Sequence, residues 1–361
     1  MGQGGGLQGE LRVPCDAGGT IGAMTSTSPT IRLTELAHGG GCGCKIAPGL
    51  LTEILARAPA GIVPPELLVG TETGDDAAVY RLNDTQALVA TTDFFTPIVD
   101  DPFDFGRIAA TNALSDIYAM GGQPIMALAL VGMPIAKLSP EVIGKVLEGG
   151  AAVCREAGIP IAGGHSIDVL EPIYGLVGLG LVHPQRVRRN ADAQAGDVLV
   201  LGKPLGVGVL SAALKKNLLD AAGYAQMLQH TTQLNRVGMA LAQLDGVHAM
   251  TDVTGFGLAG HLLEVCRGSG LHAVLELARL PLIAQAVAFA QQGIATGASG
   301  RNWAAYGSEV AWPEAAPLWQ RQLLTDPQTS GGLLVSCAQD AVPAVLAAFT
   351  AAGAGQACVV G

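Results

Sequence analysis

The chain has 361 residues, long enough for two domains, of which 49% are hydrophobic and only 14% charged. Its formal net charge of −10 argues against non-specific binding to nucleic acid or to an anionic membrane, because both favour basic surfaces. We find no long unbroken apolar stretch and no signal-peptide pattern, so we expect no membrane span. The seven cysteines are scattered and odd in number, which predicts free thiols in a reducing, cytoplasmic setting.

Residues 1–30 are rich in Gly, Ser and Thr and show no hydrophobic period, so we expect a disordered extension there, with Met24 as a hypothetical start. From residue 31 onward, strand and helix patterns alternate, which predicts an α/β (α+β-like) fold. The first half has predicted strands at 87–92, 125–131, 159–162 and 174–182. Its predicted helices are 104–120, which stops at two glycines, and one that opens at Pro140 after Ser139.

A polar break at 183–195 separates this half from a second alternation of strands and helices. The predicted strands are 197–201, 248–250 and 333–337, and the predicted helices are 207–216, 225–244 and 341–352. We therefore predict two α/β domains, residues 31–185 and residues 186–361. In each of them an apolar strand ends in a Thr-Asp pair, at Asp93 and at Asp252, which suggests related halves.

The segment 38–45 reads His-Gly-Gly-Gly-Cys-Gly-Cys-Lys. Glycine gives a backbone access to conformations that other residues avoid, so we expect a mobile strap over 38–48 that closes over a ligand. A positive charge at Lys45 would lower the pKa of Cys42 and favour its thiolate. Zinc binding remains an alternative, although His38, Cys42 and Cys44 supply only three ligands, and so does a redox dithiol, although its usual spacing is C-x-x-C.

Acidic and amide side chains recur at predicted strand ends and on one helix face: Asp75, Asp76, Asp93, Asn112, Asp116 and Asp252. The adjacent carboxylates of Asp75 and Asp76 repel each other unless a cation joins them. Mg²⁺ prefers oxygen ligands and often bridges carboxylates to substrate phosphates. The pattern thus favours a magnesium–phosphate site, and the alternative is that each aspartate caps a helix or forms a turn.

Two glycine-containing loops could present backbone amides to an anion. Residues 163–166 follow a predicted buried strand, and residues 326–332 precede another strand. Neither contains the G-x-x-x-x-G-K-[ST] pattern of a P-loop.

Taken together, these motifs resemble those of the selenophosphate synthetase (selenide, water dikinase) family. The resemblance covers nearly everything after residue 30, through the strap and the segments 74–80, 91–95, 104–112, 162–166, 250–257 and 326–332. It implies ATP-dependent synthesis of selenophosphate from selenide, with release of AMP and orthophosphate. It also implies two α/β domains similar to the aminoimidazole ribonucleotide synthetase fold, usually in a homodimer with ATP between domains or subunits.

The resemblance also implies roles for individual residues. Cys42 corresponds to the catalytic cysteine, and Lys45 corresponds to the essential strap lysine, which contacts ATP. The implied magnesium ligands are Asp76, Asp116 and Asp252. The implied ATP-contacting positions are Lys45, Thr73, Gly74, Asp75, Asp93, Asp116, Gly164, His165 and Ser166.

Two other functions stay open at this point. A purine-biosynthesis-like synthetase of the same fold would share the aspartates but would not need the Cys-x-Cys-Lys strap. A non-catalytic selenium or metal carrier would use Cys42 and Cys44 but would not need aspartates in both halves. Formation of AMP from ATP that depends on selenide and magnesium distinguishes all three.

Overall fold

The computed structural model describes residues 31–46, 48–57, 61–71 and 74–361. The disorder expected of residues 1–30 and the ATP contact expected of Thr73 lie outside the described residues. The chain from Arg32 to Gly361 forms one unit, and it contains two β-sheets.

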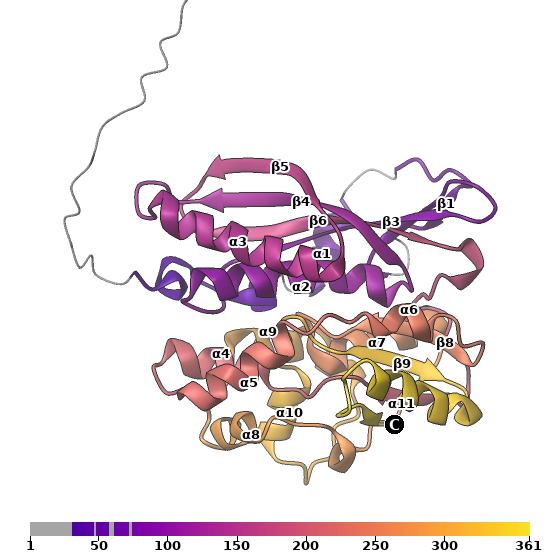
Figure 1. Ribbon diagram of the computed structural model, residues 1–361. Helices are drawn as coiled ribbons and strands as arrows, with labels where there is room; N and C mark the ends of the chain where they lie inside the picture. The colour runs from indigo at the N-terminus through magenta and orange to yellow at the C-terminus, as the bar shows by residue number, and fades with distance from the viewer. Residues whose placement is uncertain (1–30, 47, 58–60, 72–73) are drawn as a thin grey trace, which may run out of the picture. The chain divides into compact units, whose positions relative to one another are not determined.

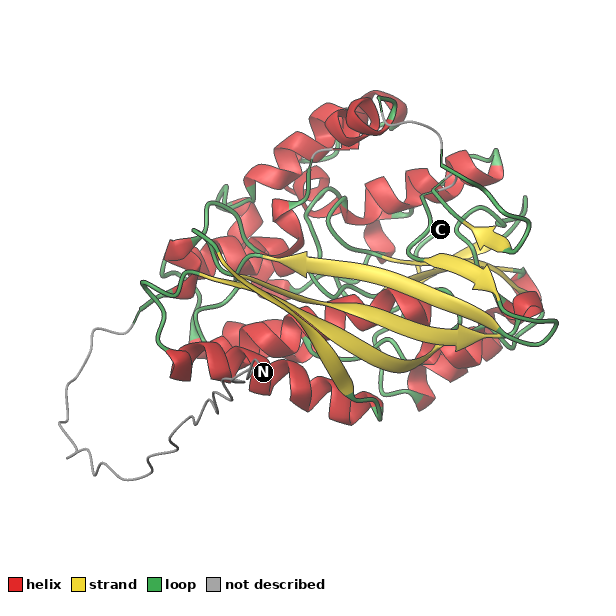
Figure 2. Ribbon diagram, turned by 90° about the horizontal axis from the view of Figure 1, so that it is seen from above, coloured by secondary structure: helices red, strands yellow, loops and turns green. Residues whose placement is uncertain are grey.

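The first sheet comes from the N-terminal half. Among the described residues it has six strands in the order β1-β2-β3-β6-β4-β5, and β4 and β5 form its parallel pair. The strands are β1 (Leu67–Val69), β2 (Ala78–Arg81), β3 (Ala87–Phe95), β4 (Gln123–Met133), β5 (Ile161–Asp168) and β6 (Ile173–Val182). Helices α2 (Pro102–Ala119) and α3 (Pro140–Ala157) cover one face of this sheet (Figure 1). Figure 2 shows the strands lying in front of the helices when the sheet is viewed from its other face.

Helix α3 begins as the sequence predicts, because Ser139 accepts a hydrogen bond from a backbone amide of its first turn. Helix α2 begins at Pro102, two residues before the predicted start, because Asp101 caps it in the same way. The two helices touch backbone to backbone. A Cβ on Gly106 of α2 would lie 1.9 Å from the Val146 carbonyl oxygen, and a Cβ on Gly149 of α3 would lie 2.0 Å from the Phe103 carbonyl oxygen. Glycine at these two positions therefore permits the close approach.

The second sheet comes from the C-terminal half. In the described part of the chain it has four strands in the order β10-β7-β9-β8, all paired antiparallel. They are β7 (Val198–Leu201), β8 (Val247–Asp252), β9 (Leu333–Cys337) and β10 (Cys358–Val359). The remaining helices are α1 (Pro48–Leu55), α4 (Val207–Lys215), α5 (Ala221–Thr231), α6 (Val237–Leu241), α7 (Gly257–Ser269), α8 (Ala284–Gln291), α9 (Gly297–Tyr306), α10 (Leu318–Leu324) and α11 (Val342–Ala351). None of the helices within the described residues is long and apolar enough to cross a bilayer.

Helix α2 lies between the first sheet and the second half of the chain (Figure 1). The Ser115 hydroxyl on α2 accepts a hydrogen bond from Asn235 Nδ2 at 2.8 Å. At Gly238 of α6 a Cβ would lie 2.0 Å from the Tyr118 carbonyl oxygen, so these backbones are also in close contact. Helix α2, which packs against the first sheet, therefore also contacts the C-terminal half directly.

Three sequence predictions about elements are wrong. The predicted helix 225–244 is two helices, α5 and α6, because the buried Lys203 ammonium takes the carbonyls of His230 and Gln233 where α5 ends. The predicted loop 163–166 belongs to strand β5, which pairs with β4 and whose residues after Ile161 are exposed rather than buried. Asp93 lies inside β3 rather than at its end.

The Thr-Asp pairs of the two halves are also less alike than the sequence suggests. Alternation along β3 buries Thr91 and Asp93 and exposes Thr92, whereas Thr251 and Asp252 are both buried on β8. Side chains alternate between the two faces of a regular strand. In β3 the side chain of Thr92, next to Asp93, therefore points away from the interior, and the side chain of Thr91 points into it.

Candidate active site

The strap is docked against the rest of the protein. Gly41–Cys44 forms a single 3₁₀ turn, and Gly41 has φ +53° with no room for a side chain, because a Cβ would lie 2.4 Å from Thr329 Oγ1. The backbone N–H of Cys42 donates to Thr329 Oγ1 at 3.1 Å. The Cys42 side chain is buried, with 1% of its surface exposed. The expected mobility of the strap stays a prediction.

Asn112 holds the Cys42 thiol. Its Oδ1 accepts the Cys42 Sγ–H at 3.2 Å and the Ser330 backbone N–H at 2.7 Å. Its Nδ2 donates to Asp93 Oδ2 at 2.5 Å. Asn112 is fully buried on α2, so one amide side chain joins the strap, strand β3 and the loop before β9.

The side chain of Lys45, which follows the 3₁₀ turn of the strap, also contacts Asp93. Its Nζ lies 3.5 Å from Asp93 Oδ2, and 37% of its side chain is exposed. Burial opposes the charged form, but the negative groups around Lys45, of which Asp93 has the largest effect, together outweigh it and raise the pKa of Lys45 well above its ordinary value. Lys45 is therefore a cation at the strap's end.

The sequence-based expectation for the Cys42 thiol is wrong. Burial raises the pKa of Cys42 well above its usual range, and the negative charge of Asp93 raises it further. Lys45 acts in the opposite direction and does not compensate. In this conformation Cys42 is a neutral thiol that donates a hydrogen bond, rather than a free thiolate.

We call the carboxylates around Asn112 and Lys45 the aspartate cluster: the half-buried Asp76 and the buried Asp93, Asp116 and Asp252. Asp116 on α2 accepts a hydrogen bond from the Thr91 hydroxyl, and Asp76 accepts one from the Thr251 hydroxyl at 2.8 Å. Asp252 ends strand β8 and has 1% of its surface exposed. Elements far apart in sequence thus bring these carboxylates to one region.

The aspartate cluster is electrostatically strained. Burial raises the pKa of Asp76 and Asp116 well above the usual carboxyl range, and repulsion from Asp252 raises both further. Burial also raises the pKa of Asp252. The Oδ2 atoms of Asp76 and Asp252 are buried without a hydrogen-bond partner. Buried orphan oxygens and mutual repulsion fit a divalent cation with oxygen ligands.

The described residues contain no ready-made group of three or more His, Cys, Asp or Glu side chains that could hold a metal ion. In proteins Mg²⁺ is often held by one or two carboxylates together with waters and substrate phosphates, so the three aspartates implied by the resemblance do not form a complete metal site by themselves. A magnesium site here would need the substrate to complete it.

Asp75 and Gly74 both bind Asn190. Asp75 Oδ1 accepts the Asn190 backbone N–H at 2.7 Å, and the Gly74 carbonyl accepts from Asn190 Nδ2 at 3.1 Å. Each carboxylate therefore has its own hydrogen-bond partner, and the negative charge of Asp75 still contributes to the raised pKa of Asp76.

Gly164, His165 and Ser166 are not brought to the aspartate cluster. They lie on edge strand β5, which β6 and β4 separate from β3. Three interstrand spacings of about 4.8 Å place β5 about 14 Å from Asp93. Gly164 also has a structural reason to be glycine, since a Cβ there would lie 2.1 Å from the Ala129 carbonyl oxygen.

Sequence reasoning placed Asn112 among the candidate site residues but missed the other residues that organise the site: Thr91, Thr251, Thr329 and Ser330. A signal existed for Asn112, which lies one helical turn before Asp116 and hence on the same face. The hydroxyl of Thr329 can be identified as part of the site only from the structure, because its contact with the strap joins segments far apart in the sequence.

Known proteins resemble the chain along most of its length. The family models "AIR synthase related protein, N-terminal domain" and "AIR synthase related protein, C-terminal domain" match residues 74–182 and 194–361. A selenide, water dikinase of Paraburkholderia xenovorans (strain LB400) is 68% identical over 337 residues, covering 93% of this chain and 95% of that protein. One of Burkholderia ambifaria (strain MC40-6) is 68% identical over 338 residues, covering 93% and 96%.

Solved structures show the same fold at low sequence identity. The crystal structure of tt0281 from Thermus thermophilus has a TM-score of 0.65 and 20% identity, and the match covers 86% of this chain and 91% of that one.

Proposed function

The chain belongs to the selenide, water dikinase family, and we propose that it makes selenophosphate from selenide and ATP at the site formed by Cys42, Lys45 and the aspartate cluster. The observation that carries the assignment to this site is the docked strap, which sets a thiol and a cation beside buried carboxylates from both halves. A carrier protein would not need those carboxylates, and a synthetase without selenium chemistry would not need the thiol.

The reaction transfers the γ-phosphoryl group of ATP to selenium. The selenium–phosphorus bond forms as the bond from the γ-phosphorus to its bridging oxygen breaks, and water then releases the β-phosphate as orthophosphate and leaves AMP. Catalysis of phosphoryl transfer is largely positioning and neutralisation of charge. Magnesium, when bound, neutralises phosphate charge and orients the phosphates.

The chain's own residues supply the rest. Asp76, Asp116 and Asp252 would hold the metal through their carboxylates, and the unpartnered Oδ2 atoms of Asp76 and Asp252 support this role. Lys45 brings a charged ammonium to the phosphates, and Asp93 keeps that ammonium protonated. Asn112 fixes the direction of the Cys42 thiol, which we propose handles the selenium.

We further propose that the ATP contacts of Gly164, His165 and Ser166 are made across a homodimer. The sheet register places Phe94, Leu130 and His165 on the face of the first sheet opposite α2 and α3. Phe94 and Ile167 are 48% and 51% exposed there. An uncovered apolar sheet face of this kind marks an interaction surface. Light scattering of Phe94→Asp should show a monomer where the unmodified chain is a dimer, and a monomeric unmodified chain would refute the proposal.

We also propose that the protein works in the cytoplasm. Every cysteine in the described part of the chain is an unpaired thiol, as is typical of a reducing compartment.

Phosphorus NMR of the ATP reaction tests the function directly. With selenide and Mg²⁺ we expect a phosphorus signal coupled to selenium, together with AMP and orthophosphate in equal amounts. Without selenide the selenium-coupled signal should be missing. ATP consumption that ends at ADP, or that yields no selenium-coupled product, would overturn the assignment.

A further inference from the structure

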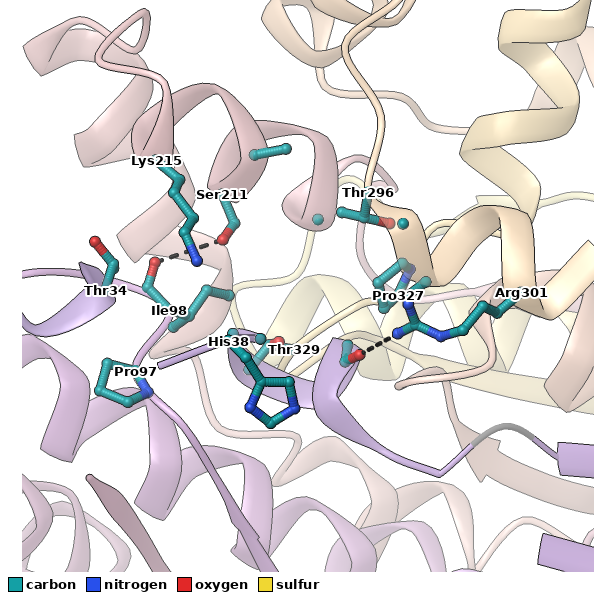
Figure 3. Close-up of a pocket in the computed structure, with 17 residues that line it drawn as sticks. Thr34, His38, Pro97, Ile98, Ser211, Lys215, Thr296, Arg301, Pro327 and Thr329 are labelled. Atoms are coloured by element: carbon teal, nitrogen blue, oxygen red, sulfur yellow. Dashed lines mark hydrogen bonds between the residues drawn. The ribbon is translucent and has the colours of Figure 1, made fainter. Parts of the chain in front are cut away.

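A cavity lies against the strap, and none of the four residues of the aspartate cluster lines it. Figure 3 shows it between the strap, helix α4, which lines it from Gly208 to Lys215, and the start of helix α9. Its volume is about 220 Å³. Strap residues Gly39, Gly40 and Gly43 form one wall, and none of the described residues that line it is acidic. We call it the rear cavity.

Two cations from the C-terminal half line the rear cavity. Lys215 Nζ donates to the Ala37 carbonyl at 3.1 Å, and Arg301 Nη2 donates to the Gly43 carbonyl at 3.0 Å. Each bond uses one N–H, so the ammonium and the guanidinium both retain donors for a ligand. The nearby carboxylate of Glu171 pairs with His38 at 2.8 Å at the rim, and Glu171 itself does not line the cavity.

Neutral donors complete the lining. Gly297 and Ala298, the first two residues of α9, line the cavity, and the side chain of the N-cap Thr296 caps Ser299, the residue that follows them. The Ser211 hydroxyl makes only a long 3.5 Å hydrogen bond to the Ile98 carbonyl. The lining thus offers two cations, a hydroxyl and the start of a helix, and it contains no carboxylate among the described residues. Such a set of donors is typical of a site that binds an oxyanion.

We propose that the rear cavity binds a tetrahedral phosphoryl anion, either orthophosphate or the phosphoryl end of selenophosphate. This inference rests on the proposed function, because that reaction releases both anions. Among the described residues, no Phe, Tyr or Trp side chain lines the cavity to stack a base, and the His38 ring is paired with Glu171, which disfavours a nucleotide. The occupant would contact Lys215, which binds the carbonyl of Ala37 just before the strap, and Arg301, which binds the carbonyl of Gly43 within it.

The proposed anion should therefore stabilise the docked conformation of the strap. It lies against the glycine wall and links the strap to α4 and α9, so its presence favours the docked strap and its departure permits opening. A ligand that binds one conformation better than another shifts the population toward it. Product anion at high concentration should accordingly slow turnover by keeping the strap docked.

Titration calorimetry with inorganic phosphate and with thiophosphate tests this inference in buffer containing EDTA, so that metal-dependent binding is removed. The test variant is Lys215→Met with Arg301→Gln, and the control is Arg267→Gln, which removes a surface arginine paired with Glu309. We expect the double variant to bind both anions about tenfold or more weakly, as is typical when a charge-assisted contact is lost. The control should bind like the unmodified chain.

Ala212→Leu provides a second variant, because it fills the cavity without removing charge. It should weaken phosphate binding while circular dichroism stays unchanged. Tighter binding of thiophosphate would assign the cavity to the selenophosphate product, and equal binding would assign it to orthophosphate. Phosphate binding that the double variant and Ala212→Leu leave intact would overturn the proposal. If unmodified protein makes selenophosphate but binds neither anion in EDTA, the rear cavity proposal alone fails.

Discussion

The two sides of the strap have opposite electrostatic character. On one side the aspartate cluster gathers four carboxylates around a single lysine, and on the other Lys215 and Arg301 line a cavity without an acid among its described residues. A metal–triphosphate complex fits the first side, and a free phosphoryl anion fits the second. The difference suggests that one short glycine-rich segment separates substrate chemistry from product handling.

Cys42 is the junction of the two sides, because its thiol contacts Asn112 of the acidic side and its amide contacts Thr329 of the rear cavity. Cys42→Ser should reduce selenide-dependent formation of selenophosphate by about a hundredfold or more, as expected when a reacting group is removed. Phosphorus NMR measures the loss. Cys358→Ser, a half-buried thiol near the C-terminus, is the control. Full activity of Cys42→Ser would remove the thiol from the mechanism.

Asp76→Asn alters the aspartate cluster and leaves the rear cavity unchanged. The variant should require about tenfold to a hundredfold more Mg²⁺ for half-maximal activity, because a carboxylate ligand is replaced by a neutral amide. Magnesium titrations of AMP formation give the value, with Asp84→Asn in an exposed turn as the control. Phosphate binding in EDTA should not change. An unaltered magnesium requirement would exclude Asp76 from the ligand set.

Asn112→Ala tests whether positioning of the thiol matters apart from metal binding. We expect kcat to fall about tenfold while the magnesium requirement stays similar, since the lost contacts orient Cys42 and Asp93 without adding or removing charge. The free energy of unfolding should fall by about 1–3 kcal/mol, because the buried Ser330 amide loses its acceptor. Asn83→Ala, in an exposed turn, is the control, and a wild-type kcat would show that Asn112 is only structural.

Lys203 binds the Ser330 carbonyl in the loop before β9, and this loop contacts both sides of the strap. Of the residues considered, Lys203 has the smallest expected effect on the reaction rate. Burial lowers the pKa of Lys203 to about 7, whereas an unfolded lysine titrates near its ordinary value of 10.5. Between these values the unfolded chain binds more protons, so stability should rise with pH by up to about 1.4 kcal/mol per pH unit.

Lys203→Met should abolish this dependence and leave the carbonyls of His230, Gln233 and Ser330 without their donor. Chemical denaturation between pH 7 and 10 measures both effects, with the exposed Lys216→Met as the control. Parallel pH profiles for the unmodified chain and Lys203→Met would contradict the assignment.

Local patterns predicted the elements with clear caps or alternation, as at Ser139 for α3 and along β6, because those signals lie in adjacent residues. They did not predict α7, α8, α9 and α10. They failed where a distant group decides the outcome. The end of α5 depends on Lys203, and the strand character of 163–166 depends on pairing with β4. The raised pKa of Cys42 depends on its burial and on Asp93, whereas its sequence neighbourhood shows only Lys45.

The contact between α2 and α3 has a consequence for natural variation in this protein. Gly106 and Gly149 leave no space for even one methyl group, and α2 carries Asn112 and Asp116 toward the reaction centre. Alanine at either glycine would force the two helices apart and displace that whole row of side chains. Inherited changes at these two positions should therefore behave as loss-of-activity alleles although they lie outside any binding pocket.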